Sequence, residues 1–178
     1  YLEDHPHDLL VLATAGRDGL ARWLRGSVAE RVARSSGTVT LFVPASAERD
    51  LVSLADGNLT LASVLVPVDH SPDPRAAVEF ARRVAAALGD ERVPIALLHV
   101  GAGDGPAVDV EDGETWAFER VQRTGDPVER ILEVAEEMAT NLIVMPTAGR
   151  NGALDALRGS TTERVLRHAP CPVLAVPA

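Results

Sequence analysis

The sequence contains no lysine, because all 17 of its basic residues are arginine. A Walker A phosphate loop requires a lysine at the β- and γ-phosphates, and a Schiff base requires a lysine amine. Both kinds of site are therefore excluded. Any phosphate group that binds this chain must be held by backbone amides, hydroxyl groups or arginines.

Cysteine and aromatic residues are also scarce. Cys171 is the only cysteine, which excludes an internal disulfide and is typical of a reducing, cytoplasmic compartment. Aromatic residues make up 3% of the chain, against 46% hydrophobic residues in all. The core must therefore be aliphatic, which suits parallel strands buried on both faces.

Long apolar runs and excess positive charge are absent from the sequence as well. No run reaches the roughly 18 apolar residues of a membrane-spanning helix, and the acidic residues 1–8 are unlike a secretory signal. The net charge of −9 disfavours binding to nucleic acid or to an acidic membrane surface. We therefore expect neither nucleic acid nor membrane as a partner.

The sequence repeats itself in part. Residues 8–44 align without a gap onto residues 141–177, and about half of the aligned positions are identical. In each copy a short apolar run (9–14 and 142–147) precedes a glycine-containing loop. A segment with helical spacing (28–34 and 161–168) and a second apolar run (39–43 and 173–176) follow. Each copy is therefore predicted to fold as strand, loop, helix and strand.

Between the two copies, predicted strands alternate with predicted helices. Strands are expected at residues 63–69, 95–100 and 116–123, and helices at residues 74–88 and 128–138, the first of them capped by Asp73. This alternation predicts right-handed βαβ units and an α/β fold with a doubly wound parallel sheet.

Five strands fall between residues 63 and 178, which is one complete domain. Residues 1–44 match only its last third, and the chain does not begin with methionine. We therefore expect a tandem protein with the C-terminal part of a first domain (1–44), a linker (45–62) and a complete domain (63–178). The Asp56-Gly57 pair in the linker predicts a hairpin.

A candidate ligand site lies in the loops that follow the first and fourth strands of the complete domain. Doubly wound sheets bind ligands beyond the carboxyl ends of strands, where the strand order reverses. Residues 147–149 follow the fourth strand, and residues 159–161 open a helix whose unpaired N–H groups favour phosphate. Asp69, at the end of the first strand, is placed to accept hydrogen bonds from an adenine amine or a ribose.

These features also have structural explanations. Glycines after strands are common, Ser160 or Thr161 can serve only as a helix cap, and Asp69 can brace the turn that follows it. A glycine-containing loop between a strand and a helix is by itself weak evidence for phosphate binding.

Four longer stretches carry a resemblance to a known family: VLVPVD (64–69), TGDPVERILEVAEE (124–137), LIVMPTAG (142–149) and GSTTERVLRHAPCPVLAV (159–176). In these stretches the chain resembles the universal stress protein family, as a tandem-type member with an incomplete first domain. The resemblance implies an adenine nucleotide alpha hydrolase-like fold. This fold is a five-stranded parallel sheet of strand order 3-2-1-4-5, here preceded by a partial copy of itself.

The family's ATP-binding pattern is glycine, two residues, glycine, nine residues, glycine, then serine or threonine. In this chain Gly149, Gly159 and Ser160 fit the spacing, whereas Pro146 stands at the first glycine and Ala13 at the equivalent position of the first copy. The resemblance therefore implies ATP, ADP or AMP as the ligand, with or without Mg²⁺.

The resemblance further implies that residues 67–69 surround the adenine while Val100 packs on its ring. It also implies that two domains pair through their last strands, here 39–43 and 173–176, either within the chain or in a homodimer. The nucleotide-binding residues that it implies are Pro67, Val68, Asp69, Val100, Met145, Thr147, Gly149, Gly152, Gly159, Ser160, Thr161 and Thr162.

Three functions remain open on the sequence. The first is a nucleotide-binding module for stress response or signalling, without robust catalysis. The second is an ATPase, at most a slow one, because neither a Walker lysine, a carboxylate pair for Mg²⁺ nor a positioned general base is evident. The third is a nucleotide-free interaction module of the same fold, which Pro146 permits.

The isolated signals favour structural explanations. His5 and His7 suggest a solvated tail rather than a metal pair, and no metal site is predicted. His70 suits a surface turn, Cys171 a packed position, and Trp116 the core or a dimer surface. The acidic residues 109–114 are typical of a solvated loop.

Overall fold

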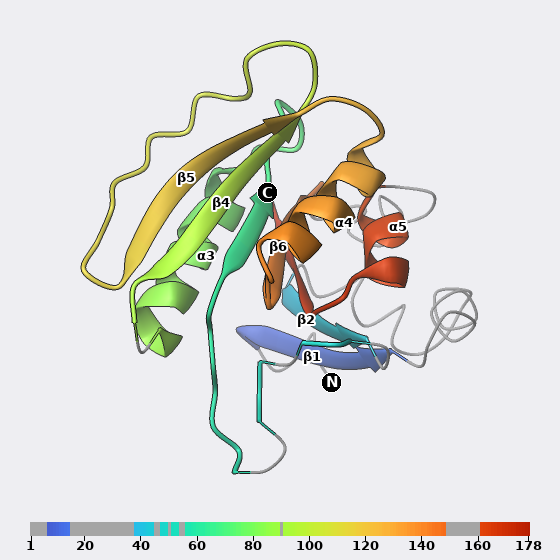
Figure 1. Ribbon diagram of the computed structural model, residues 1–178. Helices are drawn as coiled ribbons and strands as arrows, with labels where there is room; N and C mark the ends of the chain where they lie inside the picture. The colour runs from blue at the N-terminus through green and yellow to red at the C-terminus, as the bar shows by residue number, and fades with distance from the viewer. Residues whose placement is uncertain are drawn as a thin grey trace.

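The computed structural model describes residues 7–14, 38–44, 47–49, 51–53, 56–89, 91–148 and 161–178. The expected helix at residues 28–34 lies outside them. In chain order the elements (Figure 1) are β1 (Leu9–Thr14), β2 (Val39–Pro44), β3 (Val64–Pro67), α3 (Arg75–Leu88), β4 (Val93–Val100), β5 (Trp116–Arg123), α4 (Pro127–Glu137), β6 (Leu142–Thr147), α5 (Thr161–His168) and β7 (Val173–Pro177). None of these helices is long and apolar enough to cross a lipid bilayer.

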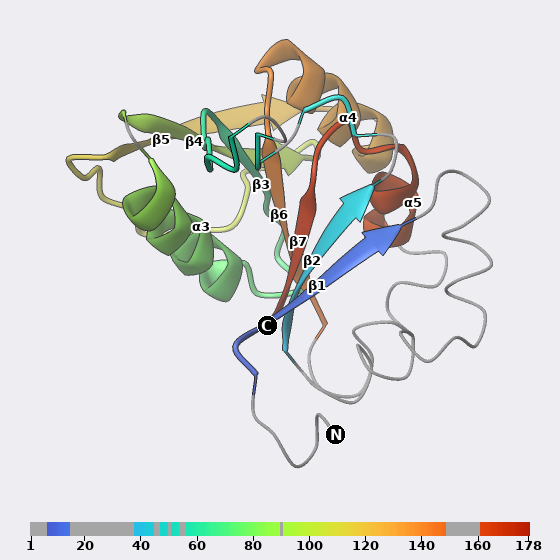
Figure 2. The same ribbon diagram turned by 90° about the horizontal axis from the view of Figure 1, so that it is seen from below.

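The seven strands in the described part of the chain form one sheet in the order β1-β2-β7-β6-β3-β4-β5 (Figure 2). The five strands from β3 onward are parallel and have the predicted order 3-2-1-4-5. β2 adds antiparallel to β7, with Phe42 opposite Val173, and β1 pairs parallel with β2. The last strands of the two repeats thus meet within the chain. Because the sheet runs on across the expected boundary, the division into domains stays a prediction.

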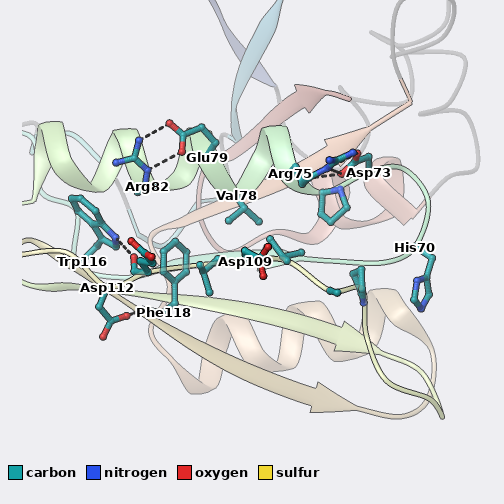
Figure 3. A pocket seen from close by; sticks show the side chains of 16 residues that line it. His70, Asp73, Arg75, Val78, Glu79, Arg82, Asp109, Asp112, Trp116 and Phe118 are labelled. Atoms are coloured by element: carbon teal, nitrogen blue, oxygen red, sulfur yellow. Dashed lines mark hydrogen bonds and ion pairs between the residues drawn. The ribbon is translucent and has the colours of Figure 1, made fainter.

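Helix α3 covers one face of the sheet. Its apolar stripe includes Val78, Ala81 and Ala85, which are buried against strand residues of β3, β4 and β6. Figure 3 shows Val78 pointing from α3 toward Phe118 of β5. The N-cap of α3 is Pro74 rather than the expected Asp73, although the Asp73 carboxylate accepts from the N–H of Arg75 at 3.0 Å.

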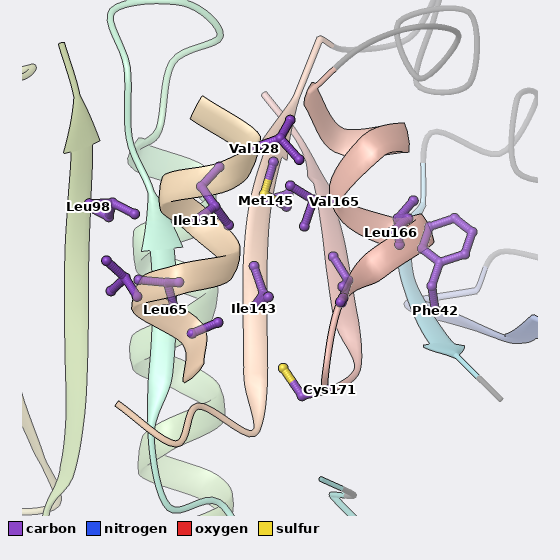
Figure 4. Packing of buried hydrophobic residues seen from close by; sticks show 14 of the residues in the cluster. Phe42, Leu65, Leu98, Val128, Ile131, Ile143, Met145, Val165, Leu166 and Cys171 are labelled. Carbon is purple, nitrogen blue, oxygen red and sulfur yellow. The ribbon is translucent and has the colours of Figure 1, made fainter. Parts of the chain in front are cut away.

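Helices α4 and α5 cover the opposite face. Leu65, Leu98 and Ile143 of the strands meet Ile131 of α4 and Val165 of α5 in one buried cluster (Figure 4). Apart from Phe42, Met145 and Cys171 the buried members of the cluster are aliphatic, as the composition predicts, because small branched side chains fill both faces of a parallel sheet.

Two boundaries differ from the sequence-based expectation by two residues, and the other described boundaries differ by at most one. β3 ends at Pro67, two residues early, because the chain turns at residues 68–73 to enter α3. β4 begins at Val93 rather than residue 95, since Pro94 still pairs with Ala117 although proline usually marks a strand end.

The linker contains the expected hairpin. Val52 and Leu59 form an antiparallel bridge, and Gly57 adopts a positive φ of 73° in the turn. The N–H groups of Glu48 and Arg49 donate to the carbonyl of Pro170 at 2.8 and 3.1 Å. This part of the chain is therefore hydrogen-bonded to the segment that connects α5 to β7.

Candidate functional site

The candidate site lies where the strand order reverses. From β3 the chain proceeds to β4 on one side, whereas β6 lies on the other side of β3. The segments that follow β3 and β6 therefore lead to helices on opposite faces and leave a crevice between the strand ends. A pocket of about 240 Å³ occupies this crevice.

One wall of the pocket is apolar. Pro67, Leu98, Val100 and Met145, from the ends of three strands, line it together with Ile131 of α4. Leu98, Ile131 and Met145 also belong to the core cluster of Figure 4. Because this wall is part of a close-packed core, it keeps its shape and suits a flat, largely apolar ring.

Hydroxyl groups come from the first turn of α5 and from the end of β6. Thr161 and Thr162 line the pocket, and Thr162 is buried. The first N–H groups of a helix have no partner within it, so this turn favours an anion. The Thr147 hydroxyl donates to the carbonyl of Val176 at 3.3 Å and is therefore committed to the sheet.

The turn after β3 closes another side of the pocket. The Val68 N–H donates to the Leu98 carbonyl at 2.8 Å, and Nδ1 of His99 lies 3.2 Å from the Val68 carbonyl. These two bonds fix Val68, so a ligand meets mainly its side chain. The exposed Asp69 carboxylate accepts from the His70 N–H at 2.8 Å and retains further acceptor capacity.

Asp126 joins the two helices that border the pocket. Its Oδ1 caps α4 by accepting from the N–H groups of Val128 and Glu129 at 3.0 and 3.1 Å. The Arg164 guanidinium of α5 donates to both oxygens of the same carboxylate, at 3.2 and 3.3 Å. The backbone bond from Glu129 and then Arg164 lower the pKa of Asp126. The first turns of α4 and α5 are thus held together.

The structure brings the described members of the expected site around one pocket. Gly149, Gly152, Gly159 and Ser160 lie outside the described residues. The lining also includes Ala148 of the loop after β6 and six residues that the sequence-based site did not include: Ser71, Pro72, Leu98, Pro127, Ile131 and Pro146. Pro127 could have been found, because a helix that follows the third strand begins beside the same sheet edge. The members of the expected site that line the pocket are Pro67, Val68, Asp69, Val100, Met145, Thr147, Thr161 and Thr162.

Cys171, His70 and Trp116 lie in the kinds of place expected of them, and His5 lies outside the described residues. Cys171 is buried, and burial raises the pKa of its thiol to about 12. His70 is exposed in the turn after β3. Trp116 is half-buried beneath Arg82, whose guanidinium carbon lies 5.3 Å from the ring centroid. Within the described ranges no three His, Cys, Asp or Glu side chains are grouped as a metal site.

Comparisons with known proteins agree on one family. The universal stress protein family model matches residues 1–44 and 107–177. A universal stress protein of Mycobacterium tuberculosis (strain H37Rv) is 29% identical over 185 residues, covering 94% of this chain and 61% of that protein. One from Methanocaldococcus jannaschii is 48% identical over 52 residues, covering 29% of this chain and 31% of that protein.

A solved structure is similar over almost the whole chain. The crystal structure of a universal stress protein from Archaeoglobus fulgidus aligns with a TM-score of 0.66 and 25% identity, covering 98% of this chain and 62% of that one. The chain therefore spans about three fifths of the length of this protein and of the mycobacterial relative. Since the family model matches more than half of its residues, the chain belongs to the universal stress protein family.

Proposed function

We propose that this protein binds ATP or a related adenine nucleotide in the pocket between β3 and β6 and acts as a stress-response or signalling module without robust catalysis. The observation that carries the proposal is the common pocket, at the switch point of the sheet, lined by eight residues that family resemblance assigns to the nucleotide. The single buried cysteine fits the cytoplasm as its compartment.

The chemistry of the lining supports a nucleotide rather than a purely apolar ligand. A base would pack on the wall of Leu98, Val100 and Met145, with Asp69 at its edge for an amine or ribose hydroxyl. Phosphates would lie toward the first turn of α5, where Thr162 and the free N–H groups replace the absent lysine. The glycines and serine of residues 149–160 would complete the phosphate site.

A nucleotide-free interaction module of the same fold is the second candidate. Pro146 favours it, because its ring lines the pocket where the family pattern has glycine and it supplies no N–H. The two candidates differ in whether ATP stabilises the folded protein.

The test is isothermal titration with ATP on the full chain, supported by thermal unfolding. Thr162→Val removes a pocket hydroxyl at nearly constant shape and should weaken ATP binding by about tenfold. The matched control is Thr140→Val, because Thr140 is also a buried threonine but lies outside the pocket. If ATP gives no heat of binding and does not change the unfolding temperature of the wild type, the nucleotide-free module is favoured.

A further inference from the structure

The connection between β4 and β5 leaves part of the sheet without a helix. Parallel neighbours are usually joined by a crossover helix that covers one face of the sheet. Residues 101–115 make this connection, and none of them is helical. On the α3 face of β5, Trp116 and Phe118 are consequently only half-buried.

A groove of about 940 Å³ lies over these two aromatic residues, between α3 and the extended residues 106–112. Val78 of α3 and Val108 of the extended segment form its apolar base, each 5% exposed. Figure 3 shows Trp116 at one end and His70 at the other, so the groove is elongated. None of the residues that line it lines the pocket between β3 and β6.

The arginines of the α3 wall are already neutralised by local acids. Arg75 pairs with Asp73 at 2.5 Å, and Arg82 pairs with Glu79 at 2.5 Å. The facing wall carries Asp109 and Glu111, which are exposed and form no ion pair with a described residue. The groove therefore combines an apolar base with uncompensated negative charge.

We propose that this groove docks a cationic peptide segment of a partner protein. Its apolar side chains would cover Phe118 and Trp116, in the place a crossover helix would take. Its arginines or lysines would meet Asp109 and Glu111. An exposed apolar surface with a polar rim marks an interaction site, and its negative charge selects a cationic partner. The site is separate from the proposed nucleotide pocket.

Fluorescence anisotropy with three labelled peptides tests the chemistry of the partner. A peptide of alternating arginine and leucine should bind. One of alternating glutamate and leucine should not, and one of alternating arginine and serine should bind at least about tenfold more weakly. Equal binding of the two arginine peptides would overturn the apolar docking, and binding of the glutamate peptide would overturn the charge complementarity.

A pair of double variants locates the binding. Asp109→Asn with Glu111→Gln should weaken the arginine–leucine peptide by about fivefold or more. Asp104→Asn with Glu114→Gln removes the same charge from the same connection but outside the groove, and should leave the affinity nearly unchanged. Equal loss in both double variants, or in neither, would place the peptide elsewhere and sink the proposal.

Discussion

Pro146 is the pocket residue that departs from the family's nucleotide-binding pattern. It is buried in β6 opposite Val176 of β7, whereas the pairing of β6 with β3 extends only over Leu142 and Ile143. On the β3 side, the missing N–H therefore breaks no ladder bond. Pro146 is therefore compatible with the sheet. Its effect should be on ligand binding, because its ring lines the pocket and it supplies no N–H there.

Pro146→Gly should therefore strengthen ATP binding. Glycine restores a backbone N–H beside the pocket and removes the ring, so we expect a dissociation constant three- to tenfold lower, as an order-of-magnitude estimate, by isothermal titration. Pro94→Gly is the control, because it removes a strand proline outside the pocket with the same unfolded-state effect. If both variants leave the affinity unchanged, the ring of Pro146 does not limit binding.

At the scale of elements, the Asp126–Arg164 pair connects α4 to α5. Asp126→Asn keeps a good N-cap but loses the charge that holds Arg164, so it should lower the thermal unfolding midpoint slightly and weaken ATP binding several-fold. Asp73→Asn is the control, since Asp73 also accepts from a backbone N–H and pairs with an arginine, but only within its own turn.

The stabilising effect of the Asp126 carboxylate should decrease as the pH falls. Because the pKa of Asp126 is lowered from 3.8 in the folded state, its carboxylate stabilises the fold above that value and loses this effect as the pH falls through the folded pKa. The difference in unfolding midpoint between the wild type and Asp126→Asn should therefore shrink below about pH 3.8. A difference that grows on acidification would contradict this account.

The first copy of the repeat contributes β2 to the hydrophobic core. Phe42 of β2 is 1% exposed and packs in the cluster between the sheet and α5. Phe42→Ala should lower the free energy of unfolding in urea by about 3–5 kcal/mol. The control Phe80→Ala removes a half-buried ring from α3 and should lower the free energy of unfolding clearly less. If Phe42→Ala lowers it no more than Phe80→Ala does, β2 is not part of the cooperative unit.

Much of this arrangement could be predicted from the sequence, because β3, β4, β6 and β7 are short apolar runs and each described helix has an apolar stripe, whereas β5 mixes apolar and charged residues. The pocket residues at strand ends, such as Asp69 and Thr147, follow from the switch-point rule alone. Leu98 and Ile131 could not be assigned to the site, because they reach it only through packing between β4 and α4. Nor did the acidic residues 109–114 reveal the groove, which depends on how they cross the face of β5.

At the scale of the whole molecule, the two copies of the repeat predict unequal nucleotide sites. Among the described strands, the first copy contributes β1 and β2 to the sheet and none that is equivalent to β3, the strand that leads to Asp69. We therefore expect one nucleotide per chain, and titration calorimetry should give a stoichiometry near one. Two equivalent sites on a monomer would contradict this expectation.

The outer edge of the sheet predicts the state of assembly. Among the described strands β1 pairs only with β2, and Leu9 and Val11 are 43% and 57% exposed on it. An open, apolar strand edge invites pairing with another chain, so we expect a second chain to cover β1 at micromolar concentration. Val11→Lys places a charge on this edge and should shift the mass measured by light scattering toward the monomer. Val52→Lys, at a 43% exposed valine of the linker hairpin, should not. If the wild type is a monomer in which β1 pairs only with β2, the prediction that a second chain covers this edge is wrong.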